Sequence, residues 1–187
     1  MAKRISLRDF QKSLSERLVS ARRGDGGQAL LGVESGNAEI AGGERWLIDL
    51  TDSGEVVPLT TLTAVPLTHA WFAGIANIRG ALYSVVDFSA WRGGPPTPRN
   101  PEARLLLIGA RHGINTALLV RRALGLRPGA QMTAMDEAKV PAGTQSADAG
   151  DTATWLGGRY ADPEGVAWTQ LRIPALLATP DYLDIAR

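Results

Sequence analysis

The sequence contains no cysteine and only two histidines. Without cysteine the chain has no disulfide, no thiolate metal site and no cysteine nucleophile. His69 and His112 have no second histidine or carboxylate at the spacing of a metal site, and we expect both side chains to be exposed to solvent. The sequence also lacks a G-x-S-x-G nucleophile elbow and a phosphate-binding GK[ST] loop. These absences argue against an enzyme and indicate neither a cofactor nor a metal.

A strong net charge and a long apolar run are also missing. The 20 lysines and arginines almost balance the 19 acidic residues, which argues against a nucleic-acid-binding protein. No segment reaches the ~18–20 consecutive apolar residues that cross a bilayer. The apolar residues near the N-terminus are separated by polar ones, unlike those of a signal peptide. We therefore expect a cytoplasmic protein with no membrane insertion.

Residues 1–23 are predicted to form an amphipathic helix that carries a net charge of +5. Ser6 is a suitable N-cap, and apolar residues follow it at the three- and four-residue spacing of a helix. These are Leu7, Phe10, Leu14, Leu18 and Ala21. Such a helix either packs on the domain through its apolar stripe or binds a partner or an acidic membrane surface. Residues 24–28 follow it as a glycine-rich joint.

From residue 29 onward the pattern changes to short strands separated by turns. Strands are predicted at 29–34, 44–50, 55–60, 81–88, 104–110, 114–121, 159–160 and 166–173. Residues 81–88 are expected to be buried on both faces, and residues 136–154 to form a mobile loop. A short helix is expected after Pro174, with a further turn after Pro180. Many short strands with frequent turns favour barrels or a sandwich over a parallel α/β sheet.

The stretch WFAGIANIRGALYSVVDF, residues 71–88, places Arg79 and Asp87 among apolar residues. An unpaired charge in a dry interior is costly, so each needs a partner or access to water. Glu55 is the predicted partner of Arg79, in a bidentate ion pair that ties its strand to the corner at 77–80. That pair either only shapes the fold or belongs to a binding surface. A second hypothesis places Arg79 and Asp87 in one pocket of a β-barrel that binds an anionic or hydroxylated small molecule.

The same stretch holds two aromatic residues and two glycines whose roles differ. Trp71 and Phe72 fit either the core or an exposed interface, where large aromatic side chains often anchor a partner. Gly74 and Gly80 allow tight turns and close approach of neighbouring backbone.

Residues 65–93 resemble the signature of the CheW-like domain family. The signature has a proline, a tryptophan, a G-[IV]-x-N-x-R-G segment and a strand that ends in [VI]-[VI]-D, and the matching residues are Pro66, Trp71, Gly74, Asn77, Arg79, Gly80, Val86 and Asp87. The segment GEVVPL resembles a second family strand, with Glu55 at its acidic position and Val56 beside it. Residues 104–129 resemble a later hairpin of the family, and the likeness covers roughly residues 28–178.

One departure from the family pattern changes a charge. The family hairpin ends in a valine-aspartate pair, whereas this chain has Arg121 and Arg122 after Val120. Together with the basic N-terminal helix, this makes the chain more similar to the family members of type IV pilus chemosensory systems, which control twitching motility.

The resemblance implies a mostly β fold with two small five-stranded, SH3-like β-barrel halves around a shared core. Residues 29–178 would form this domain, between the N-terminal helix and a C-terminal tail at 179–187. The implied function is that of a non-catalytic adaptor without cofactor, recruited to membrane receptor arrays. It would couple the cytoplasmic tip of a methyl-accepting chemoreceptor, bound in the groove between the halves, to the regulatory domain of a CheA-type histidine kinase, bound by strands of the first half. The residues assigned to this binding surface and motif are Glu55, Val56, Trp71, Phe72, Gly74, Asn77, Arg79, Gly80 and Asp87.

Overall fold

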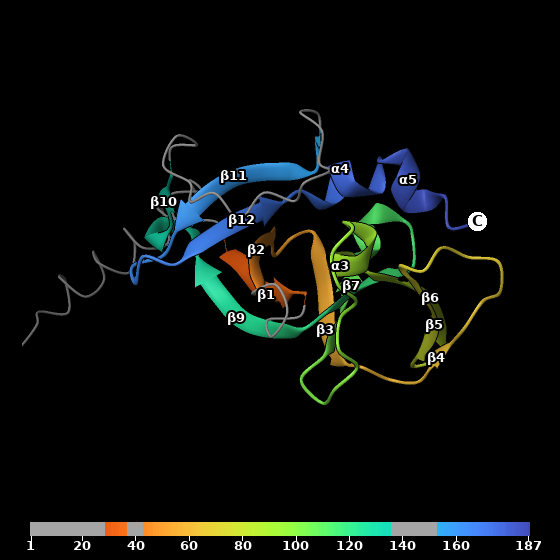
Figure 1. Cartoon of the computed structure of the whole chain (residues 1–187). Coiled ribbons are helices and arrows are strands. Elements are labelled where there is room, and N and C mark those ends of the chain that lie inside the picture. The colour runs from red at the N-terminus through yellow and green to blue at the C-terminus, as the bar shows by residue number, and fades with distance from the viewer. Residues whose placement is uncertain (1–28, 37–42, 136–152) are drawn as a thin grey trace, which may run out of the picture.

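The computed structural model describes residues 29–36, 43–135 and 153–187, and these residues form two six-stranded sheets (Figure 1). The prediction of a mostly β protein built from two halves is confirmed. The predicted N-terminal helix at 1–23, the joint at 24–28 and most of the predicted loop at 136–154 lie outside the described residues.

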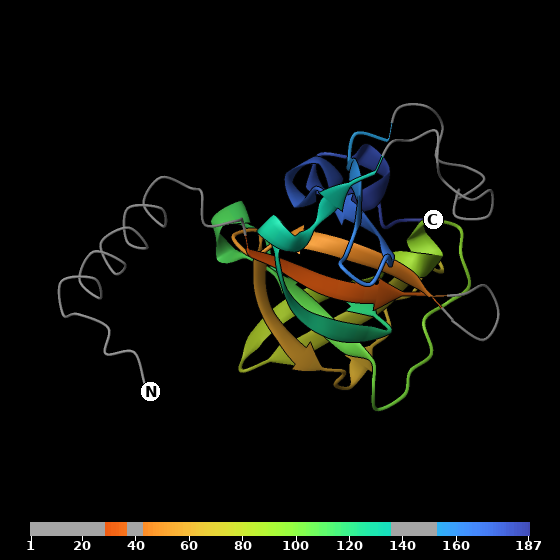
Figure 2. The ribbon, with the colours of Figure 1, turned by 90° about the vertical axis from the view of Figure 1, so that its left-hand side faces the viewer.

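Sheet A combines the first two strands of the described chain with the last four. Its order is β10 (Thr133–Ala134), β11 (Leu156–Ala161), β12 (Ala167–Leu171), β2 (Glu44–Asp49), β1 (Ala29–Ser35) and β9 (Arg122–Pro128). Neighbouring strands are antiparallel except β12 and β2, which are parallel. Figure 2 shows β1 and β9 in front of the strands of sheet B.

Sheet B is continuous in sequence and is inserted between β2 and β9 of sheet A. Its order is β3 (Ser53–Pro58), β7 (Arg104–Ile108), β8 (Thr116–Val120), β6 (Ala81–Asp87), β5 (Phe72–Ile78) and β4 (Leu62–Thr63). Each sheet therefore has five longer strands and one two-residue edge strand. In the described part of the chain the outermost strands of a sheet do not pair with each other, so both sheets are open and curved rather than closed barrels.

Most predicted strands are confirmed, and the differences have local causes. The two strands at 104–110 and 114–121 form the β7–β8 hairpin, joined by the 3₁₀ turn η1 (Ala110–His112). A second 3₁₀ turn, η2 (Gly129–Gln131), precedes β10. The expectation that residues 81–88 are buried on both faces is wrong for their first half, because Leu82 is 61% exposed where β6 extends beyond the core.

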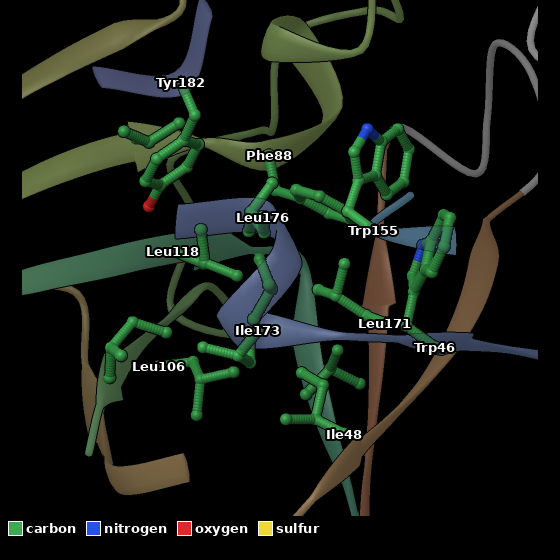
Figure 3. Packing of buried hydrophobic residues seen from close by; sticks show 14 of the residues in the cluster. Trp46, Ile48, Phe88, Leu106, Leu118, Trp155, Leu171, Ile173, Leu176 and Tyr182 are labelled. Atoms are coloured by element: carbon green, nitrogen blue, oxygen red, sulfur yellow. The ribbon is translucent and has the colours of Figure 1, made fainter. Parts of the chain in front are cut away.

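The main core lies between the two sheets and is closed by two short helices, α4 (Ile173–Leu177) and α5 (Pro180–Leu183) (Figure 3). Ile48 of β2, Leu106 of β7 and Leu118 of β8 meet in this layer and are fully buried. Alternate residues of these strands face this core, while on β7 and β8 the residues between them, such as Leu105 and Leu119, are also buried and pack in a second cluster on the other face of sheet B.

Aromatic side chains join the two halves at one end of the core. Helix α3 (Phe88–Trp91) follows β6, and the Phe88 ring contacts Trp46 of β2 edge to face, with centroids 5.1 Å apart. The Arg92 guanidinium lies 4.4 Å from the centroid of Trp46 and forms an ion pair with Glu44. A cation over an aromatic face is attractive and is strengthened by burial, so Arg92 links α3 of one half to β2 of the other.

The C-terminal residues 179–187 pack on the domain. Tyr182 is only 2% exposed, and its hydroxyl lies 3.2 Å from Oγ1 of Thr116 on β8. Burial raises the pKa of Tyr182 to about 12. Nearby, the backbone N–H of His69 donates to the carbonyl of Ile185 over 3.0 Å. The chain end therefore holds the loop that leads into β5.

Candidate functional site

The β5–β6 hairpin turns through two residues in the left-handed backbone region. Ile78 pairs with Ala81, and the residues between them, Arg79 and Gly80, have φ of 53° and 86°. This is the geometry of a type I′ turn, which matches the twist of the flanking strands and favours Asn-Gly. The Asn77 side-chain oxygen accepts a hydrogen bond of 2.9 Å from the Gly80 N–H. A positive φ strains the backbone of an arginine, so the surrounding structure must stabilise this conformation of Arg79.

Arg79 and Glu55 form the bidentate ion pair that the sequence predicts. The two guanidinium nitrogens donate to the two carboxylate oxygens over 2.6 Å each. Glu55 lies on β3, at the opposite end of sheet B from β5, so the pair spans the opening of the curved sheet. The hydrogen bond to Glu55 raises the pKa of Arg79.

This ion pair is exposed to solvent. The Arg79 side chain is 75% exposed and that of Glu55 is 46% exposed. Two solvated side chains gain little net stability from pairing, so the fold does not depend strongly on the pair. Exposed Asn77 and exposed Leu82 pair with each other on the strands of the hairpin, and half-buried Val56 follows Glu55 on β3 with its side chain packed against the main core. Together, Glu55, Val56, Asn77, Arg79, Gly80 and Leu82 are called the hairpin tip below.

Asp87 has a different environment at the other end of the hairpin, called the hairpin base below. Asp87 is 6% exposed, and its carboxylate accepts hydrogen bonds from the Thr97 N–H at 2.7 Å, the Thr97 hydroxyl at 2.8 Å and the Ala90 N–H at 3.3 Å. It thereby caps α3 and ties the proline-rich loop to the sheet. Three donors satisfy a buried carboxylate, so Asp87 serves the fold. The contact between Thr97 and Asp87 could not be predicted, because Thr97 belongs to no sequence motif.

Arg79 and Asp87 do not meet. Arg79 lies in the turn before the first residue of β6 and Asp87 is its last residue, so the six steps of the strand, at about 3.3 Å each, separate them by roughly 20 Å. The hypothesis of one small-molecule pocket that contains both side chains is therefore wrong.

Gly74 lies within β5, and Trp71 and Phe72 lie at the hairpin base, next to Asp87 and Val86 of β6. The φ of Gly74 is 123°, and a Cβ there would lie 2.4 Å from the Thr63 carbonyl oxygen of β4, so the close approach of β4 requires glycine. Phe72 is 7% exposed and belongs to the core. Trp71 is half-buried and stacks on His69, with ring centroids 5.3 Å apart.

The expectation that both histidines are exposed to solvent is wrong. His69 is half-buried against Trp71. The His112 side chain is 10% exposed, and its Nε2 lies 3.0 Å from Oδ1 of Asp52. The turn η1 folds back on the β2–β3 turn, where Arg111 pairs with the same carboxylate at 2.7 Å. In the described ranges no group of three or more histidines, cysteines or carboxylates could hold a metal ion.

The two arginines that depart from the family pattern have a partner that sequence reasoning missed. Glu34 on β1 is 3% exposed and forms ion pairs with both Arg121 and Arg122. Burial by itself would raise the pKa of Glu34, but hydrogen bonds from Arg122 and Arg121 outweigh burial and hold that pKa below its ordinary value. The arginines therefore bind β1 to the β8–β9 junction.

Comparisons with known proteins agree with this architecture. A family model described as the CheW-like domain matches residues 40–148, which include the whole hairpin. PilI of Pseudomonas aeruginosa is 28% identical over 67 residues, and this stretch covers 36% of the chain but only 38% of PilI. Scaffolding protein TtCheW from Thermoanaerobacter tengcongensis shares the fold with a TM-score of 0.62 and 17% identity, over 85% of this chain and 97% of that chain.

Proposed function

The chain belongs to the CheW-like domain family, and from this premise we propose that it is a non-catalytic adaptor. It couples the cytoplasmic tip of a methyl-accepting chemoreceptor to the regulatory domain of a CheA-type histidine kinase. The fold likeness to a protein described as a scaffolding protein supports this role.

The observation that carries the proposal is the hairpin tip. Arg79 is held in a strained backbone conformation and is exposed, yet both of its terminal nitrogens are fixed by Glu55. Strain that persists at an exposed position is typical of functional sites. A guanidinium that is already oriented loses less side-chain freedom when a partner binds, so the tip suits recognition of another protein.

Leu82 adds exposed apolar area at the hairpin tip, and Val56 connects the tip to the main core. Leu82 is 61% exposed, and Val56 is half-buried on the edge strand β3. A few apolar anchors surrounded by polar groups are the usual composition of a protein interface. We assign this surface to the receptor and the kinase, and assign buried Phe72 and Asp87 to supporting the hairpin.

The likeness to PilI supports an output in type IV pilus, or twitching, motility. The adaptor would act in the cytoplasm at membrane receptor arrays. No helix in the described parts of the chain is long and apolar enough to cross a membrane.

Binding measurements with purified proteins test the proposal. The full chain is titrated with a chemoreceptor cytoplasmic hairpin and, separately, with a CheA-type regulatory domain. We expect saturable binding to both, weakened at least tenfold by Arg79→Ala or Leu82→Asp in one or both titrations. Arg99→Ala is the matched control, because Arg99 is an exposed arginine in the loop between α3 and β7. Absence of binding to both partners, or equal loss with Arg99→Ala, contradicts the proposal.

A further inference from the structure

The face of sheet A that points away from sheet B has a small core of its own. Leu30 of β1, Leu47 of β2 and Trp168 of β12 are buried together there. Arg45 precedes Leu47 by two positions on β2, and Arg127 of β9 pairs with Leu30. Alternate residues of one strand, and residues that pair across two strands, share a face. Both arginines therefore lie on this face.

Both guanidinium groups lie over the ring of Trp168. The Cζ atom of Arg127 is 5.1 Å from the centroid of the ring, and that of Arg45 is 5.7 Å from it. Trp168 is 1% exposed, and its Nε1 donates to Oδ2 of Asp162 over 3.0 Å, so the ring is fixed. Because a cation is attracted to the face of an indole ring, Trp168 holds both arginines in position.

The two arginines have no acceptor within the described parts of the chain. There, neither Arg45 nor Arg127 forms an ion pair or a side-chain hydrogen bond, and Nε of Arg127 is buried without a partner. A buried donor without an acceptor is uncommon in folded proteins and lowers their stability. Both residues are only half-buried, so part of each side chain stays open to a ligand.

The acidic residues on the same face are bound to other donors. Glu34 pairs with the two arginines that follow β8, Asp49 accepts hydrogen bonds from Thr51, and Asp162 accepts from Trp168. Asp162 attracts Arg127 through its charge but forms no ion pair with it. The positive charge of Arg45 and Arg127 is therefore available to an acidic ligand from outside the described fold.

The charges and their place in the sheet indicate the kind of ligand. A carboxylate can accept two parallel hydrogen bonds from one guanidinium, so two arginines suit a ligand with at least two carboxylates. The chain is nearly neutral, and two arginines do not form the extended basic surface that binds a phosphate backbone. Arg127 lies on β9, an outermost strand of the described sheet A, which an extended peptide can approach from its edge.

We propose that Arg45 and Arg127, supported by Trp168, form a binding site for an acidic segment of a partner protein. The site lies on sheet A, whereas the hairpin tip lies on sheet B. The proposal is therefore independent of the adaptor role, and its test uses neither a receptor nor a kinase.

An NMR titration of the ¹⁵N-labelled full chain with a capped hexaglutamate peptide tests the site. The assigned indole N–H signal of Trp168 reports on the site itself, whatever the peptide contacts elsewhere. We expect this signal to shift saturably, with an affinity at least tenfold lower in the double variant Arg45→Gln, Arg127→Gln. The matched control is Arg99→Gln, which removes an exposed arginine from the loop between α3 and β7 and should bind as the wild type does.

Two further probes identify the ligand chemistry. A capped hexaglutamine peptide has the same length without the charges and should leave the Trp168 signal in place. Citrate supplies carboxylates without a peptide, and affinity for citrate equal to that for hexaglutamate would overturn the assignment to a protein segment.

Two results would overturn the site itself. One is a Trp168 signal that does not move with hexaglutamate, and the other is wild-type affinity in the double variant. If the double variant does not fold, the single variants Arg45→Gln and Arg127→Gln give the same test, with affinity expected to fall at least threefold in each.

Discussion

The two ends of the β5–β6 hairpin carry motif residues of opposite physical character. At the hairpin tip Arg79 is exposed, strained and paired with a partly exposed carboxylate. At the hairpin base Asp87 is buried, and three donors surround its carboxylate. Water can hydrogen-bond to the exposed Arg79 guanidinium if its ion pair breaks, but water cannot reach the buried donors around Asp87. We therefore propose that the exposed charge at the tip serves recognition, whereas the buried charge at the base serves the fold.

The largest loss of stability is expected when the hairpin base is broken. Asp87→Ala leaves the buried donors of Thr97 and Ala90 without an acceptor, and each unsatisfied group costs about 1–3 kcal/mol. We expect the free energy of unfolding to fall by about 2–4 kcal/mol, measured by urea denaturation. Thr97→Val removes only the hydroxyl donor and should cost about 1 kcal/mol. Wild-type stability in Asp87→Ala would contradict the structural role of the carboxylate.

The glycines of the hairpin offer the next comparison. Gly74→Ala combines a φ of 123° with a Cβ that would lie 2.4 Å from the Thr63 carbonyl oxygen, and we expect a loss of about 1–3 kcal/mol. At the tip a Cβ on Gly80 meets nothing within 4 Å, so Gly80→Ala should cost only the conformational strain, about 1 kcal/mol. Thermal and urea unfolding of both variants measures the difference. Equal losses of stability in the two variants would show that the short distance between Gly74 and β4 does not require glycine.

The buried ion pairs of Glu34 differ from the exposed pair of Glu55. Because the folded-state pKa of Glu34 lies below its ordinary value of 4.5, its contribution to stability is complete above that value. The contribution is lost as the pH falls through the folded-state pKa. Glu34→Gln should therefore reduce stability at pH 7 by about 1–2 kcal/mol, and the difference from wild type should shrink as the pH falls below 4.5. A difference independent of pH, measured by urea unfolding from pH 7 to 3, would contradict the cause assigned to the shift.

The smallest change in stability is expected at the hairpin tip. Arg79→Asn breaks the exposed pair but supplies a residue that tolerates the left-handed backbone region. We expect its urea midpoint to remain close to that of the wild type. A loss as large as that of Asp87→Ala would show that the tip, like the base, serves the fold.

More of the hairpin tip than of its surroundings could be predicted from the sequence. An arginine in an apolar run needs a carboxylate, and Glu55 was the matching residue, so the pair is predictable. Its exposure was not predictable, because exposure depends on how far β5 and β6 extend beyond the core. The partner of Asp87 was hidden for another reason: Thr97 lies in a proline-rich loop with no periodic pattern.

The strands were also only partly predictable from the sequence. Periodicity located β1, β2, β7 and β8, whose apolar residues alternate or run together. It missed β5 and β9 as separate strands, because Gly74 and Gly125 adopt positive φ at irregularities of pairing that interrupt the two-residue alternation. The partners of Arg121 and Arg122 were also missed, because Glu34 lies 87 and 88 positions away in the chain.

The most direct test of the recognition role of the hairpin tip is an exchange of its two charges. The double variant Arg79→Glu, Glu55→Arg keeps an ion pair between β3 and the hairpin but exchanges which strand carries each charge. Its binding to the receptor hairpin and to the kinase regulatory domain is measured beside its urea unfolding. We predict near-wild-type stability with binding to at least one partner reduced tenfold or more. Wild-type binding to both partners would contradict the account, because the pair would then act only by holding the shape of the tip.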